Sequence, residues 1–85
     1  MYFVYILRSV KHSEKIYVGY TINILERLQI HNDGKSLYTA KYKPWELSWY
    51  ACFFDESAAV SFEKYLKSGS GKAFAKNHFL QARPP

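Results

Sequence analysis

Cysteine, acidic residues and long apolar runs are all scarce in this chain of 85 residues. The single cysteine, Cys52, excludes an intrachain disulfide, and a cysteine-based zinc site would need several further ligands. No stretch approaches the roughly 20 apolar residues of a membrane span. The apolar run at the N-terminus has no basic region ahead of it, and Arg8 and Lys11 interrupt it before it reaches signal-peptide length. We therefore expect a cytoplasmic protein.

Acidic residues number 7 against 12 lysines and arginines, which gives a net charge of +5. No acid follows Glu63, whereas a run of cations does: Lys64, Lys67, Lys72, Lys76 and Arg83. A basic chain meets polyanions quickly and favours them as partners, nucleic acids included. Because many small domains of other kinds are also basic, the charge by itself does not identify the partner.

Aromatic residues, in contrast, are abundant at 19%. A domain this small buries only roughly 60 to 65% of the surface of its unfolded chain, so its core has to be compact. Large aromatic side chains, each burying on the order of 150 to 250 Å², can fill such a core. We expect one domain over residues 1–80, followed by a short tail of residues 81–85.

Apolar patterning predicts three strands and three helices. The strands are expected over residues 2–8, 16–21 and 45–54, where β-branched and aromatic residues run together or alternate with polar ones. Asn23 as cap and Glu26 three residues later predict a helix over residues 24–31, and Asp55 begins a second helix that reaches Lys67. The Gly-Ser-Gly at residues 69–71 is expected to break the chain before a final helix over residues 72–80, and residues 35–44 to form a basic loop.

Two tyrosines stand out in the first two strands. Tyr5 and Tyr17 are an even number of residues apart, so both side chains leave the same face of an antiparallel hairpin in which they lie opposite or diagonal to each other. A tyrosine in a strand most often serves packing, and a phenol with a reference pKa of ~10 is a poor base unless a cation lowers that value. Gly19 interrupts the second strand, which is typical of a bulge or of a close approach to the backbone.

The first helix carries an arginine and a histidine one turn apart. With Ile24, Leu25 and Leu28 as the buried stripe, Arg27 and His31 are expected side by side at its edge. A guanidinium can hold a phosphate bidentately, and an imidazole can move a proton near neutral pH. The simpler alternatives are a solvated arginine and a histidine that favours the negative end of the helix.

Glu63 in the second long helix has two interpretations. It is spaced for an exposed ion pair with Lys67, worth roughly a few tenths of a kcal/mol. It also lies at the border of the apolar stripe that includes Phe62, and one carboxylate with phosphate oxygens and water is a typical arrangement for Mg²⁺. Phosphodiester cleavage needs such a counter-charge for its transition state.

The order of these residues resembles the GIY-YIG nuclease domain, of the small stand-alone bacterial kind, over nearly the whole chain. Phe3-Val4-Tyr5 stands where the family has Gly-Ile-Tyr, and Tyr17-Val18-Gly19 stands for Tyr-Ile-Gly. Arg27, His31 and Glu63 match the family's helical arginine, its histidine one turn on and its metal-binding glutamate, and Asn77 corresponds to a late asparagine of several members. Phe3 departs from the family pattern. It should be tolerated if the position only packs in the strand, but its bulk could narrow the approach to the site.

The resemblance implies an α/β fold of the α+β type, with a small three-stranded antiparallel sheet flanked by helices. It also implies one Mg²⁺ or Mn²⁺ held mainly by Glu63, and attack of water on a DNA phosphodiester. On this hypothesis Tyr5 or Tyr17 positions or deprotonates the water, with His31 as an alternative proton acceptor, and Arg27 stabilises charge on the phosphate. Four lysines are expected to hold the DNA backbone: Lys41, Lys43, Lys64 and Lys72. Because no added DNA-binding domain is expected, target selection has to come from this small basic surface or from a protein partner.

Two other functions stay open on the sequence alone. The chain could be a nucleic-acid-binding module that keeps the fold without cutting. It could also be a protein-interaction adaptor that uses exposed aromatic residues around Tyr38, Tyr42 and Trp45. Metal-dependent cleavage separates the enzyme from both, and binding that weakens steeply with salt separates the nucleic-acid module from the adaptor.

Overall fold

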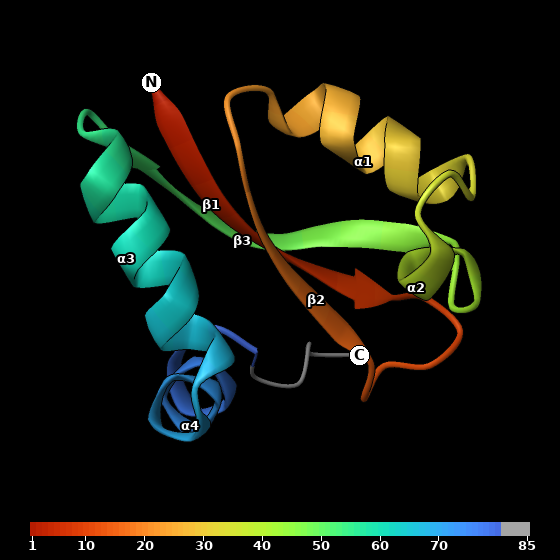
Figure 1. Cartoon of the computed structure of the whole chain (residues 1–85). Coiled ribbons are helices and arrows are strands. Elements are labelled where there is room, and N and C mark those ends of the chain that lie inside the picture. The colour runs from red at the N-terminus through yellow and green to blue at the C-terminus, as the bar shows by residue number, and fades with distance from the viewer. Residues whose placement is uncertain (81–85) are drawn as a thin grey trace.

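The computed structural model describes residues 1–80 as a three-stranded sheet with helices packed on both of its faces (Figure 1). The elements in chain order are β1 (Tyr2–Ser9), β2 (Ile16–Thr21), α1 (Ile24–Asn32), α2 (Leu37–Ala40), β3 (Trp45–Phe53), α3 (Glu56–Lys67) and α4 (Gly69–His78). The fold is therefore of the α+β type, as predicted. The expected tail of residues 81–85, with Arg83 in it, lies outside the described residues.

The strand β1 is the centre of the sheet. The order is β2-β1-β3, and both pairings are antiparallel, with an irregularity between Ile6 and Leu7 where β1 meets β3. Residues 4–7 of β1 are all buried, because the strand is covered on both faces. Its unbroken apolar run predicted this central position.

Two small cores lie on the two faces of the sheet. On one face, Val4, Ile6 and Val18 pack against Ala59 and Leu66 of α3 and against α4. On the other face, Tyr5, Leu7 and Trp45 form a second cluster, joined by Tyr17 and by Leu28 of α1. Figure 1 shows α3 and α4 on one side of the strands and α1 and α2 on the other. Within residues 1–80, none of the helices is long and apolar enough to span a membrane.

Helix α1 turns a different stripe to the sheet from the one predicted. Leu25 is 78% exposed, whereas His31 is completely buried. Ile24, Leu28 and His31 are spaced by four and three residues, so they share one face, and Leu25 lies about 100° away from Ile24 on the solvent side. The predicted start of the helix is correct, since the Asn23 side chain accepts a hydrogen bond from the Glu26 backbone N–H at 3.1 Å.

Two further predictions about helices were wrong. Residues 35–44 are not a plain loop, because they contain the short helix α2. The Gly-Ser-Gly segment does not break the chain but forms the first turn of α4, whose cap is Ser68. A Cβ atom on Gly71 would stand 1.7 Å from the Tyr65 carbonyl oxygen. The glycine therefore lets α4 pack directly against the end of α3.

Candidate functional site

The register of the hairpin brings Tyr5 and Tyr17 together. Tyr5 lies opposite Gly19 and Tyr17 lies opposite Leu7, so the two tyrosines are diagonal neighbours on the same face. Their ring centroids are 6.3 Å apart. The even spacing of the two residues correctly predicted this shared face, which is the face covered by α1 and α2.

Gly19 makes room for the Tyr5 side chain. A Cβ atom on Gly19 would stand 2.3 Å from the Tyr5 hydroxyl oxygen and 2.4 Å from its Cζ atom. The phenol therefore lies directly over the glycine backbone. The sequence predicted either a bulge at Gly19 or a close approach of another group to its backbone, and the structure shows the close approach. The irregularity of the sheet lies elsewhere, between β1 and β3.

A chain of buried polar contacts starts at the Tyr5 hydroxyl. His31 Nε2 lies 3.2 Å from the Tyr5 oxygen, and His31 Nδ1 lies 2.7 Å from the hydroxyl oxygen of Thr39 in α2. Tyr5 is 1% exposed, and the other two residues are completely buried. Tyr17 meets the same imidazole through its ring, with centroids 4.7 Å apart. His31 is thus an internal partner of Tyr5 rather than a group at the exposed helix edge.

Charge and burial set the protonation of these groups. Burial raises the pKa of Tyr5 above its ordinary value of 10, although a hydrogen bond from Arg27 opposes this rise. Burial also lowers the pKa of His31 below its ordinary value of 6.5, and the positive charge of Arg27 lowers it further. At neutral pH His31 is therefore an uncharged imidazole, with one ring nitrogen able to accept a proton.

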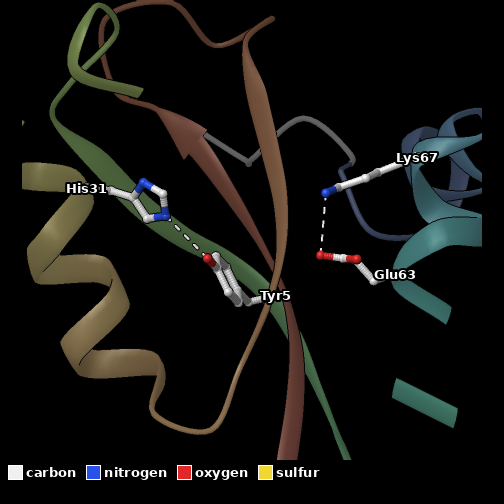
Figure 2. A network of polar contacts seen from close by, with 4 residues as sticks. All are labelled: Tyr5, His31, Glu63 and Lys67. Carbon is white, nitrogen blue, oxygen red and sulfur yellow. Dashed lines mark hydrogen bonds and ion pairs between the residues drawn. The ribbon is translucent and has the colours of Figure 1, made fainter. Parts of the chain in front are cut away.

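Glu63 reaches this region from α3, on the other side of edge strand β2. Its carboxylate oxygen Oε2 forms an ion pair with Lys67 Nζ at 3.4 Å (Figure 2), and this is the pairing that the helical spacing predicts. The Glu63 side chain is 20% exposed, and its negative charge is among the influences that raise the Tyr5 pKa. The Lys67 ammonium lies 5.9 Å from the centre of the Tyr17 ring. The carboxylate and ammonium of α3 therefore lie near edge strand β2, which carries Tyr17 and pairs with the strand of Tyr5.

A basic groove continues from this edge. A concavity of about 280 Å³ is lined by Tyr17, Tyr38, Lys67 and Lys72 among others. It shares Ile16, Tyr38 and Lys72 with a second concavity of about 550 Å³, whose lining adds three further cations and one acid, namely Arg8, Lys15, Lys76 and Glu14. The shared residues make the two hollows parts of one surface, which we call the basic groove.

Residues 1–77 match the model of the GIY-YIG catalytic domain.

The chain belongs to the GIY-YIG family.

Several GIY-YIG relatives carry the name UPF0213 protein. One from Bacillus licheniformis is 43% identical over 58 residues, which are 67% of this chain and 60% of the relative. One from Oceanobacillus iheyensis is 37% identical over 67 residues, covering 78% and 76% of the two chains. A third, from Haloquadratum walsbyi, is 37% identical over 68 residues, covering 79% and 74%. The match thus spans about three fifths of the first relative's length, and the names state no activity or substrate.

Nucleases of the GIY-YIG family generally use a divalent metal ion, which has to be bound by oxygen or nitrogen atoms of nearby side chains or of the substrate. Residues 1–80 contain no cluster of three or more histidine, cysteine, aspartate or glutamate side chains that could cage a metal. Glu63 offers a single, partly exposed carboxylate. Mg²⁺ commonly keeps several waters and binds through one or two carboxylates together with substrate phosphates. The residues therefore fit an ion that the protein and its substrate hold jointly.

The other residues that the sequence predicted for the site lie at several separate places in the fold. Of the four lysines predicted to hold DNA, Lys72 lines the basic groove, whereas Lys64 is exposed on α3 and Lys41 and Lys43 are exposed between α2 and β3. Asn77 is exposed on α4. Phe3, in the place of the family glycine, is half-buried and lies 6.3 Å from the Tyr50 ring of β3, centroid to centroid. It packs along the sheet two residues before Tyr5.

Thr39 is the site residue that the sequence did not reveal. It lies in a segment that carried only a basic, aromatic pattern, and its role depends on α2 folding against α1. A threonine between Tyr38 and Ala40 gives no local signal of a buried contact with a histidine eight residues earlier. Lys15 was also missed as a groove residue, because the groove forms only when the β1–β2 loop meets α4.

Proposed function

We propose that this protein is a divalent-metal-dependent endonuclease that hydrolyses phosphodiester bonds in DNA. The observation that carries the proposal is the contact of the Tyr5 phenol with a buried, uncharged His31, on the sheet face where Tyr17 also lines the basic groove. Hydrolysis of a phosphodiester needs a proton acceptor for water and positive charge for the phosphate. Membership of the GIY-YIG family supports the same chemistry.

Tyr5, rather than Tyr17, is proposed to handle the proton. The Tyr5 hydroxyl touches a base, His31 Nε2, so it can pass its own proton inward while it takes one from the attacking water. The Tyr17 hydroxyl has no hydrogen-bond partner within residues 1–80, and its ring faces both the imidazole and the groove. Tyr17 is therefore proposed to orient the water or the phosphate.

Arg27 is proposed to serve both the phenol and the phosphate. Its hydrogen bond to Tyr5 stabilises negative charge on the phenolic oxygen, which eases the transfer of the proton. A guanidinium also stabilises the charge that develops on a phosphate oxygen. By keeping the His31 pKa low, its charge leaves the imidazole free to accept a proton at neutral pH.

Glu63 is proposed to hold the divalent ion. When bound, Mg²⁺ or Mn²⁺ supplies positive charge against the phosphate and its leaving oxygen. Lys67 pairs with the same carboxylate in the free protein and also borders the groove, so it is placed to turn towards the DNA backbone.

Removal of metal provides the first test of the proposed function. We expect the purified chain to nick supercoiled DNA in Mg²⁺ or Mn²⁺, to lose that activity in excess EDTA, and to regain it when the metal is restored. Agarose electrophoresis of the nicked and linear products measures the effect. If the rate in EDTA equals the rate in metal, the metal-dependent mechanism is wrong. If DNA binds and is never cut, the alternative of an inactive nucleic-acid-binding module replaces the enzyme.

The basic groove is the proposed path of the DNA backbone. Each phosphate contact contributes to the fall of affinity with salt, with a slope of about −0.9 per contact on duplex DNA. We expect Lys72→Ala combined with Lys76→Ala to reduce the slope of log affinity against log salt by about 2. The comparison pair is Lys41→Ala with Lys43→Ala, which removes the same charge at two lysines that the sequence also predicted to hold DNA but that lie outside the groove. A reduced slope for the comparison pair and an unchanged slope for the groove pair would assign the DNA to the other surface.

A location in the cytoplasm and the identity of any targeting partner stay predictions from the sequence.

A further inference from the structure

Thr39 occupies the far end of the buried chain of contacts from Tyr5. Its hydroxyl oxygen lies 2.7 Å from His31 Nδ1 and donates to the Ser36 carbonyl oxygen at 3.4 Å. The residue has no exposed surface, although its neighbours Leu37 and Tyr38 in the same helix are 96% and 55% exposed. A short helix that buries one hydroxyl against one imidazole points to a specific role for that hydroxyl.

The position of Thr39 is fixed by the start of β3. The Trp45 indole N–H donates to the Thr39 carbonyl oxygen at 2.7 Å. The Trp45 backbone is in turn held by Asn32, whose side-chain oxygen accepts from the Trp45 N–H at 2.6 Å and whose amide group donates to the Trp45 carbonyl at 3.0 Å. Since Asn32 directly follows His31, the imidazole and the hydroxyl are anchored to the same frame.

The network of donors and acceptors allows two arrangements of the His31 proton. In the first, Nδ1–H donates to Thr39, which donates to Ser36, and bare Nε2 accepts from the Tyr5 hydroxyl. In the second, the Thr39 hydroxyl donates to Nδ1, and Nε2–H donates to the Tyr5 oxygen. The Tyr5 proton then lacks an acceptor, because Arg27 can only donate. A buried hydroxyl without an acceptor is costly, so the first arrangement is the favoured one.

We propose that Thr39 is a positioning residue, which keeps the His31 proton on Nδ1 so that Nε2 is free to take the proton of Tyr5. This inference rests on the proposed function. During the reaction the water proton passes to the Tyr5 oxygen as the Tyr5 proton passes to Nε2, and the imidazolium then donates from both nitrogens. Thr39 accepts from Nδ1 before and after the transfer, so no side chain has to turn.

The other groups around His31 are compatible with this assignment. Tyr5 comes from β1, Tyr17 from β2 and Arg27 from the preceding turn of α1, and the two aromatic ring centroids lie 6.3 and 4.7 Å from that of the imidazole. None of these three residues carries a carboxylate, which would draw the proton to Nε2. By accepting from Nδ1–H, the hydroxyl of Thr39 thus supports the arrangement that leaves Nε2 free for the Tyr5 proton.

The tautomer of His31 tests the proposal directly, in the ¹⁵N-labelled full chain at neutral pH. His31→Gln identifies the His31 signals by their loss. We expect ¹⁵N chemical shifts of a protonated Nδ1 and a bare Nε2 in the parent. Thr39→Val keeps the shape but removes the acceptor of Nδ1–H, so each tautomer then leaves one buried donor unpaired, and part of the His31 population should shift its proton to Nε2. Thr39→Ser retains the hydroxyl and should retain the parent tautomer.

Cleavage by the same variants supplies the functional half of the test. We expect Thr39→Val to lower the cleavage rate about 10- to 100-fold, the loss seen when the partner that orients a metal-ligating histidine is removed, and Thr39→Ser to stay within a few-fold of the parent. A parent protonated at Nε2, a tautomer unmoved in Thr39→Val, or parent-like cleavage by Thr39→Val overturns the proposal. A chain with the expected tautomers that never cuts DNA overturns the proposed function instead.

Discussion

Tyr5→Phe is expected to lower the rate of DNA cleavage by about 10³-fold, within the range of roughly 10² to 10⁴ that a general acid–base group contributes. The substitution keeps the ring over Gly19 and removes only the hydroxyl, so the sheet packing remains. What is lost is the acceptor for the water proton and the donor to His31 Nε2. A single-turnover cleavage assay in Mg²⁺ measures this effect.

Tyr17→Phe is the matched control for that loss. It removes a phenolic hydroxyl from the same face of the sheet, but one that has no hydrogen-bond partner within residues 1–80. We expect a smaller decrease in rate than for Tyr5→Phe, with similar far-UV circular dichroism in both. Should Tyr17→Phe be the more damaging change, the proton would have to be assigned to Tyr17 and the His31 relay abandoned.

Gly19→Ala is expected both to destabilise the fold and to remove most of the activity. The added methyl carbon would stand 2.3 Å from the Tyr5 hydroxyl oxygen, and Tyr5, at 1% exposed, has little room to retreat. Overpacking of this kind costs about 1 to 3 kcal/mol of unfolding free energy. Any displacement of the phenol also lengthens its contact with His31, and a shift of about 1 Å at a reacting group can reduce a rate about 10²-fold.

Gly69→Ala offers a matched comparison for the glycine change. A Cβ atom on Gly69 would meet nothing within 4 Å, and the residue lies at the first position of α4. Alanine there should leave the unfolding free energy unchanged or raise it by up to about 1 kcal/mol. Urea unfolding of the two variants and the parent measures both effects. Equal stability and parent-like cleavage in Gly19→Ala would show that the close approach of Tyr5 to the backbone has no importance for the site.

The parts of the fold that the sequence predicted correctly are those with strong local patterns. The unbroken apolar run of β1 predicted its central place, and the cap at Asn23 predicted the start of α1. The even spacing of Tyr5 and Tyr17 predicted a shared face, because side chains alternate along a strand whatever the rest of the chain does. Gly19 was also marked correctly as a place of close approach.

The errors arose where tertiary contacts override local preference. Helix α2 is only four residues long, too short to be stable by itself, and it is held by the Trp45 indole rather than by its own sequence. Gly71 is a poor helix former, yet α4 includes it because any residue with a Cβ atom would clash with the Tyr65 carbonyl. His31 is polar and was placed at the helix edge, but two buried hydroxyls satisfy both of its ring nitrogens and allow it to be buried.

The candidate site shows the same division. The residue types of Tyr5, Arg27 and Glu63 could be selected from the sequence and from the family resemblance, whereas the contact that distinguishes Tyr5 from Tyr17 requires the fold. The Glu63 and Lys67 ion pair was predicted from helical spacing and is present. That pair by itself is compatible with a structural glutamate. The role of Glu63 as the metal ligand is a proposal, which the Glu63→Gln variant tests.

The cleavage of supercoiled DNA by Glu63→Gln, beside the parent and Glu56→Gln, tests the central claim most directly. Glu56 is an exposed glutamate of the same helix α3, so its substitution removes the same charge away from the site. With Mg²⁺ present, we predict nicking by the parent and by Glu56→Gln, and a loss of about 10²- to 10³-fold in Glu63→Gln, the range typical when charge stabilisation is removed from a transition state. Parent-like cleavage by Glu63→Gln, or no cleavage by the parent, would contradict the assignment of this chain as a metal-dependent endonuclease.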